Sequence, residues 1–202
     1  MRASSFRVDS RVWGRVLAAA LALTLTTAAL AGCGSEDKPK ADPSPTSKPS
    51  TPAGLDTTPP RKPAEQSETK AGAVEYGRYF TLLVQHAIRM RDVRPVMAEA
   101  LDQAKCTTCR RLSEFIEDLR DDKLWEIEPD LQLGKYNARR TADGFQVSGA
   151  FEYPPGRFVT VGGSEKNTVT GGPYAFAGDV VWDADRSRWR VLDYSFVNKT
   201  KD

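Results

Sequence analysis

Apolar residues recur at steps of three and four positions between residues 71 and 124, the spacing of helices that bury one face. The first stripe consists of Tyr76, Tyr79, Phe80, Leu83, Val84, Ala87, Ile88 and Met90. Asp92 can cap a second helix, which tolerates Pro95 because that residue lies in the first turn. A third stripe consists of Leu112, Phe115, Ile116, Leu119 and Leu124. The pattern predicts three helices in succession.

After Pro129 the apolar period changes to two, which is typical of half-buried strands. Strands are expected at 131–140, 145–153, 157–161, 174–182 and 188–197. The turns between them contain Asp143-Gly144, Pro154-Pro155-Gly156 and residues 183–187. Three helices followed by an antiparallel sheet predict one α+β domain over residues 71–202.

The N-terminus has the three parts of an export signal: a basic stretch to Arg15, an apolar run from Val16 to Leu30, and small residues before Cys33. The end of this signal, Leu30-Ala31-Gly32-Cys33, resembles the lipobox of bacterial lipoproteins. That resemblance implies cleavage after residue 32 and acylation of Cys33. The alternative is an uncleaved signal anchor, but the apolar run is shorter than the ~20 residues needed to span a bilayer.

The segment between the lipobox and the domain has the composition of a spacer. Residues 34–70 contain no aromatic residue, a single large aliphatic residue, Leu55, and eight of the thirteen prolines. Such a segment cannot bury enough apolar surface to offset the entropy of ordering, so residues 33–70 are expected to be a lipidated cysteine and a disordered linker. Glycosylation of the linker or its capture by proline-binding modules are alternatives to a plain spacer.

The charge balance argues against nucleic acid as a partner. The whole chain has a formal net charge of +2, but much of that excess lies in the signal segment, which contains Arg2, Arg7, Arg11 and Arg15. Without residues 1–32 the chain is close to neutral, with acids interspersed among the bases. It therefore lacks the clustered positive field that binds phosphates.

The domain also resembles known families. The order of helices and strands looks like the nuclear transport factor 2-like fold, a cone in which a curved sheet wraps a long helix. The segment from Ala71 to Phe80, Asp92 and the pair Cys106-Thr-Thr-Cys109 are similar to an uncharacterised family of actinobacterial lipoproteins. This chain has Arg91 where that family usually has a glycine before the Asp. The family has no established activity, so the resemblance implies a fold and not a function.

The chain contains three cysteines, and acylation of Cys33 would leave Cys106 and Cys109 as the remaining thiols in an oxidising compartment. They are expected to form a disulfide that holds the start of the third helix. A redox-active pair is an alternative, but such a pair usually follows a strand in a βαβ unit. A metal site would need further ligands, and the chain has one histidine, His86. We therefore expect no metal and no cofactor.

No motif after the anchor predicts a reaction. A single histidine excludes most Ser-His-Asp and Cys-His mechanisms unless His86 is itself central. Cone-shaped enzymes place carboxyl groups and tyrosines inside the cone, where burial can raise a carboxyl pKa. The candidates for such a pocket are Asp193, Asp179, Tyr136 and Tyr153. Asp193 is the first choice, because a strict period of two puts it on the strand face of Trp189 and Val191.

The leading hypothesis is a non-enzymatic lipoprotein, anchored through Cys33 to the extracytoplasmic face of the cell membrane. Its domain would bind a small apolar ligand, an envelope component or an exported protein. The alternative is a small isomerase-like or cyclase-like enzyme that uses a buried Asp in the cone. A third hypothesis is a homodimerisation module, in which two copies pair through their sheets.

Overall fold

A computed structural model describes residue 52 and residues 55–64 and 67–199. Its helices are α1 (Lys70–Met90), α2 (Arg94–Glu99) and α3 (Thr107–Asp121). The side chain of Thr69 caps α1 by accepting a hydrogen bond from the Gly72 N–H at 3.0 Å. The three predicted helices are confirmed. The third ends earlier than predicted, because Leu124, placed in its apolar stripe, belongs to a strand.

A left-handed residue separates α1 from α2. Arg91 adopts φ 51° and ψ 39°, a conformation that favours glycine, at the position where the resembled family usually has one. Its guanidinium lies 3.7 Å from the ring centroid of Trp125, a contact that opposes the conformational cost. The Asp92 carboxylate accepts a hydrogen bond from the Arg94 N–H at 3.0 Å, although the N-cap position itself is occupied by Val93.

In the described part of the chain, seven strands follow the helices and form two antiparallel sheets. The four-stranded sheet has the order β2-β3-β6-β7, and the three-stranded sheet has the order β1-β4-β5. The strands are β1 (Leu124–Ile127), β2 (Gln132–Arg140), β3 (Phe145–Tyr153), β4 (Gly156–Thr160), β5 (Glu165–Val169), β6 (Gly172–Asp183) and β7 (Arg188–Asn198). The predicted hairpin of the last two strands is confirmed, whereas β1 and β5 were not predicted.

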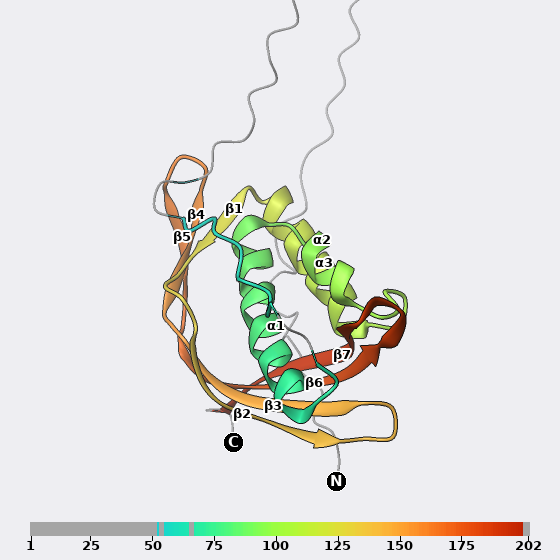
Figure 1. Cartoon of the computed structure of the whole chain (residues 1–202). Coiled ribbons are helices and arrows are strands. Elements are labelled where there is room, and N and C mark those ends of the chain that lie inside the picture. Colours follow the sequence, from blue (N-terminus) through green and yellow to red (C-terminus); the bar gives the residue numbers. More distant parts are fainter. Residues whose placement is uncertain (1–51, 53–54, 65–66, 200–202) are drawn as a thin grey trace, which may run out of the picture. The chain divides into compact units, whose positions relative to one another are not determined.

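The long helix α1 packs on the concave side of the curved four-stranded sheet (Figure 1). Its buried residues include Tyr76, Phe80, Leu83 and Ala87, as the helical stripe predicts. The domain is therefore α+β, with three N-terminal helices packed against antiparallel sheets. This arrangement is consistent with the nuclear transport factor 2-like fold that the sequence suggests.

The folded unit begins before residue 71, the boundary predicted from the sequence. The Lys62 ammonium lies 2.6 Å from the Glu99 carboxylate, which also accepts a hydrogen bond from the hydroxyl of the buried Tyr76. The Trp189 indole N–H donates to the Ser67 carbonyl at 3.0 Å. The end of the predicted linker is therefore attached to the domain.

The predicted signal peptide, Cys33 and the linker up to residue 51 lie outside the described residues. None of the helices in the described part is both long and apolar enough to cross a membrane.

Candidate functional site

Aromatic side chains fill the space between α1 and the four-stranded sheet. The rings are those of Tyr76, Phe80, Tyr136, Phe145, Phe151, Phe176, Trp189, Tyr194 and Phe196, most of them in contact with at least one other ring of the group. Phe80, Phe176 and Trp189 are almost completely buried. A small apolar ligand would have to displace these rings to enter the cone.

Tyr136, one of the four predicted pocket residues, belongs to this core. Its hydroxyl donates to the Thr81 hydroxyl oxygen at 2.9 Å, and the Arg78 guanidinium lies 5.4 Å from the centroid of its ring. Burial raises the pKa of Tyr136 above its ordinary value. Its surroundings are those of a packed tyrosine whose hydroxyl is satisfied.

Asp193 lies outside the cone, and the prediction that it shares the face of Trp189 and Val191 is wrong. Asp179 of β6 pairs with Asp193 of β7, whereas the next residue of β6, Val180, pairs with Val191. Leu192 is therefore an extra residue in β7, a β-bulge. This bulge reverses the alternation beyond it, and the aromatic residue that faces the core is Tyr194.

The Asp193 carboxylate holds the start of α3. One of its oxygens accepts hydrogen bonds from the Thr108 N–H at 3.0 Å and from the Tyr194 N–H at 2.9 Å. The Thr108 hydroxyl donates in turn to the Tyr194 carbonyl. A carboxylate at this position stabilises the N-terminus of the helix, where backbone N–H groups lack partners.

Asp179 is exposed on β6, directly opposite Asp193, and accepts a weak hydrogen bond from the Gln146 amide at 3.5 Å. The structure thus brings the two predicted aspartates together on the outer face of the sheet. Neither lies with the core residue Tyr136, so these residues do not form the predicted pocket.

Cys106 and Cys109 are bonded to each other, as the sequence predicts. Cys106 is the N-cap of α3, and its sulfur accepts a hydrogen bond from the Cys109 N–H at 3.3 Å. Both cysteines are fully buried. Disulfide exchange requires access of a thiolate to sulfur, so this burial supports a structural bridge over a redox-active one.

Tyr153 leads to a group of buried polar side chains that the sequence did not reveal. Its hydroxyl donates to a carboxyl oxygen of Glu126 at 2.7 Å. Glu126 lies on β1, and Glu128 lies just beyond the end of that strand. Their exposed fractions are 3% and 9%. Gln85 and Arg89, one helical turn apart on α1, are also buried. These five residues, Gln85, Arg89, Glu126, Glu128 and Tyr153, are called the carboxyl cluster below.

The helix side of the cluster binds the chain where it passes from one sheet to the other. The Gln85 amide donates to the Glu128 carboxylate at 2.9 Å, and its carbonyl oxygen accepts from the Leu131 N–H at 3.3 Å. The Arg89 guanidinium donates to the Pro129 carbonyl at 2.7 Å and forms an ion pair with Asp130 at the same distance. These contacts hold the segment 128–131 against α1.

The electrostatics of the cluster favour a protonated carboxyl group. Burial, followed by the nearby Glu128 carboxylate, raises the pKa of Glu126 from 4.5 to about 8. The same environment raises the pKa of Tyr153 far above its ordinary value, mainly through burial and then through the charge of Glu126. Glu126 is therefore mostly protonated at neutral pH.

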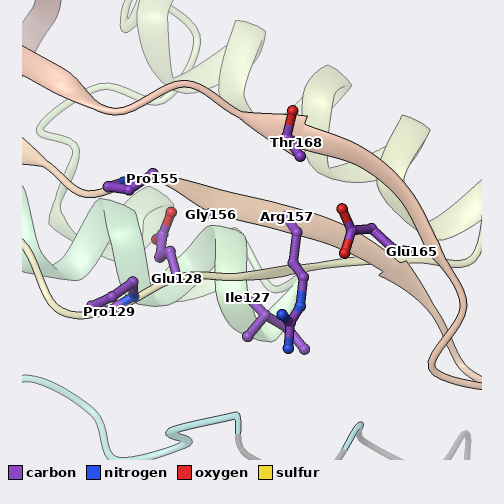
Figure 2. Close-up of a pocket in the computed structure, with 8 residues that line it drawn as sticks. All are labelled: Ile127, Glu128, Pro129, Pro155, Gly156, Arg157, Glu165 and Thr168. Atoms are coloured by element: carbon purple, nitrogen blue, oxygen red, sulfur yellow. The ribbon is translucent and has the colours of Figure 1, made fainter.

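An open groove lies on the face of β1, β4 and β5 toward which Ile127 and Arg157 point (Figure 2). This outer groove encloses about 460 Å³ and is lined by Ile127, Glu128, Pro129, Pro155, Gly156, Arg157, Glu165 and Thr168. A second hollow of about 350 Å³ shares Ile127 and Arg157 with it and extends to Val161 and Pro52. Gly156 allows β4 to approach, because a Cβ there would lie 2.9 Å from the Cβ of Glu128.

Two charged side chains of the outer groove, Arg157 and Glu165, are available to meet a ligand. Among the residues that the structure describes, neither Arg157 nor Glu165 has an ion pair or a side-chain hydrogen bond. By contrast, no group of three or more metal-ligating His, Cys, Asp or Glu side chains occurs in this part of the chain, and His86 is half-buried with its pKa lowered mainly by burial. The groove suits a ligand with charged and apolar groups.

Replacement of Asp193 by alanine should destabilise the domain by about 1–2 kcal/mol, because the Thr108 N–H at the start of α3 loses its acceptor. Asp179→Ala is the matched control. It removes the exposed acid opposite Asp193 and should change stability by less than about 0.5 kcal/mol. Urea denaturation of both variants measures the difference, and equal losses would contradict the capping role of Asp193.

Replacement of Glu126 by glutamine should alter how stability depends on pH. The unfolded chain releases the Glu126 proton near its ordinary pKa of 4.5, whereas the folded chain keeps it up to about 8. The stability that the proton contributes is therefore complete below about pH 4.5 and is lost as pH rises toward about 8, by about 1 kcal/mol per pH unit.

Glu126→Gln removes this loss, so its free energy of unfolding should exceed that of the wild type by an amount that grows between these pH values. Urea denaturation across the range measures it, with the exposed Glu152→Gln as control. A constant difference at every pH would show that Glu126 titrates normally.

Comparison with known proteins adds a likeness of fold. No protein-family model matches the chain, and no curated protein matches it. Among solved structures, the crystal structure of the intermembrane space region of the chloroplast protein ARC6 is similar over 66% of this chain and 100% of that chain, with a TM-score of 0.42 and 15% identity. This distant likeness assigns neither a family nor a function to the chain.

Proposed function

We propose that the chain is a lipid-anchored, extracytoplasmic binding protein that takes an extended segment of another exported protein into the outer groove. The observation that carries this proposal is that the open space adjoins β1, β4 and β5, whereas aromatic rings fill the cone. The lipobox-like tetrapeptide ending at Cys33 supports the location.

The open edge of β5 favours an extended peptide as the partner. Among the strands that the structure describes, β5 has a neighbour on one side only, β4, so its outer N–H and C=O groups can pair with an added strand. Main-chain pairing of this kind supplies affinity, and side-chain contacts beside it supply specificity.

The side chains next to this edge indicate the composition of the segment. Arg157 lies opposite Thr168 in the pairing of β4 with β5, and both line the outer groove with the apolar Ile127. An acidic residue of the added segment could pair with Arg157, and an apolar residue could cover Ile127. The partner is thus a peptide segment that alternates acidic and apolar residues.

The enzyme alternative has less support. The carboxylate on which it relied, Asp193, accepts two backbone hydrogen bonds outside the cone. The carboxyl groups of Glu126 and Glu128 are close together, but they are buried beneath α1 rather than presented to a substrate.

Site-specific photocrosslinking in intact cells tests the binding surface. A benzophenone side chain at Thr168 should yield a discrete crosslinked species, and the same group at the exposed Glu114 on α3 should not. Arg157→Ala should weaken the Thr168 crosslink, and mass spectrometry should map it to a segment with acidic and apolar residues. A crosslink only to a second copy of the chain, or a crosslink that persists unchanged in Arg157→Ala, would contradict the proposal.

Metabolic labelling tests the anchor. Labelled palmitate should enter the wild-type chain, and Cys33→Ser should abolish the label and release the protein from the membrane fraction, since stable attachment requires the acyl chains. A variant with serine at both Cys106 and Cys109 should retain the label. A Cys33→Ser chain that keeps the label would overturn the assignment.

A further inference from the structure

The carboxyl cluster contains a buried carboxylate oxygen that no donor satisfies, and the Arg89 Nε beside it is buried without an acceptor. One oxygen of Glu128 has hydrogen-bonding and ionic partners: the Gln85 amide at 2.9 Å and the Arg89 Nε at 3.6 Å. The other, Oε2, is buried and has no hydrogen-bond donor among the described residues. An unpaired carboxylate oxygen in such a site costs free energy of the order of a lost hydrogen bond.

A proton on Glu126 resolves this deficit. The Glu126 and Glu128 side chains project from the same side of the chain, two residues apart, and both are buried beside the Tyr153 hydroxyl and the Gln85 amide. A protonated Glu126 can donate to Glu128 Oε2 while it accepts from the Tyr153 hydroxyl. Tyr153, Glu126, Glu128 and Gln85 then form one continuous chain of hydrogen bonds.

The charges around the pair support one proton and not two. The groups that act electrostatically on Glu126 are Glu128, Tyr153 and Arg89, and the β4 residue opposite it is the apolar Phe158. Arg89 supplies one positive charge, which it shares with the exposed carboxylate of Asp130. That charge can balance the Glu128 carboxylate, and among the residues that the structure describes no cation forms an ion pair with Glu126.

The pair lies directly behind the outer groove. Ile127, between the two glutamates, points into the groove, and Glu128 and Pro129 contribute to its wall (Figure 2). The same segment is held to α1 by Gln85 and Arg89. Repulsion between the two carboxyl groups would therefore act directly on the groove wall, because Glu128 is part of that wall and only Ile127 separates Glu126 from it in the chain.

We propose that Glu126 and Glu128 hold one proton between them and that this proton is a switch. When it is bound, the segment 128–131 is locked against α1, and when it is released, repulsion between the two carboxylates frees this wall of the outer groove. The switch is a property of the groove wall itself and does not rest on the proposed partner.

Two measurements on the full chain in detergent test the proposal without any ligand. Carbon-13 NMR of the glutamate carboxyl groups should show one glutamate that titrates at about 8, and Glu126→Gln should remove that titration. Hydrogen exchange should show that the Leu131 amide, which donates to Gln85, loses protection about tenfold per pH unit between about pH 4.5 and this midpoint, after correction for intrinsic exchange, and little more above it. In Glu126→Gln the protection should be independent of pH.

Two further variants keep the test decisive. Tyr153→Phe removes a hydrogen bond that lowers the pKa of Glu126, so the midpoint for Leu131 should move to higher pH. The exposed Glu152→Gln should behave as the wild type. The proposal is overturned if Glu126 titrates near its ordinary pKa of 4.5, or if Glu126 titrates high while the protection of Leu131 does not follow it.

Discussion

The packing of α1 against the aromatic face of the four-stranded sheet is the contact on which the rest of the domain depends. Almost every inward-facing ring of β3, β6 and β7 belongs to the cluster around Phe80 and Phe176. Burial of this apolar surface is the main stabilising contribution in a domain of this size. The same rings occupy the inside of the cone, and the open groove that the structure shows lies outside it, against β1, β4 and β5.

A second, polar contact joins α1 to the chain at the crossing between the two sheets. Gln85 and Arg89 lie on the helix face next to the aromatic stripe and reach the backbone from Glu128 to Leu131. Buried charges of this kind rarely add net stability, but removal of one partner is costly. The contact therefore fixes the position of β1 relative to α1 and, with it, the shape of the outer groove.

Periodicity predicted the helices and the long hairpins because each buries one face with a regular repeat. It failed at local irregularities. Leu124 continues the apolar stripe of α3, but Lys123 adopts φ 54° and the helix has already ended. The facing of Asp193 was wrong because a bulge at Leu192 shifts the alternation, and no residue type marks that bulge.

The carboxyl cluster escaped prediction for a different reason. Charged residues are expected on the surface, so Glu126 and Glu128 were not considered as core positions. Two weak signals were present: a period of two through Leu124, Glu126 and Glu128, and the spacing of four between Gln85 and Arg89 within an apolar stripe. The lipobox-like tetrapeptide that ends at Cys33, in contrast, is a linear motif and is recognised from the sequence alone.

The central claim is that the cone is closed and that ligands meet the domain outside it. Two-dimensional NMR of the labelled chain, titrated with a small apolar probe such as indole, tests this claim most directly. The account predicts no saturable shift of the Phe176 and Tyr194 resonances. Saturable shifts of these core rings, with the Ile127 methyl resonances unchanged, would contradict it.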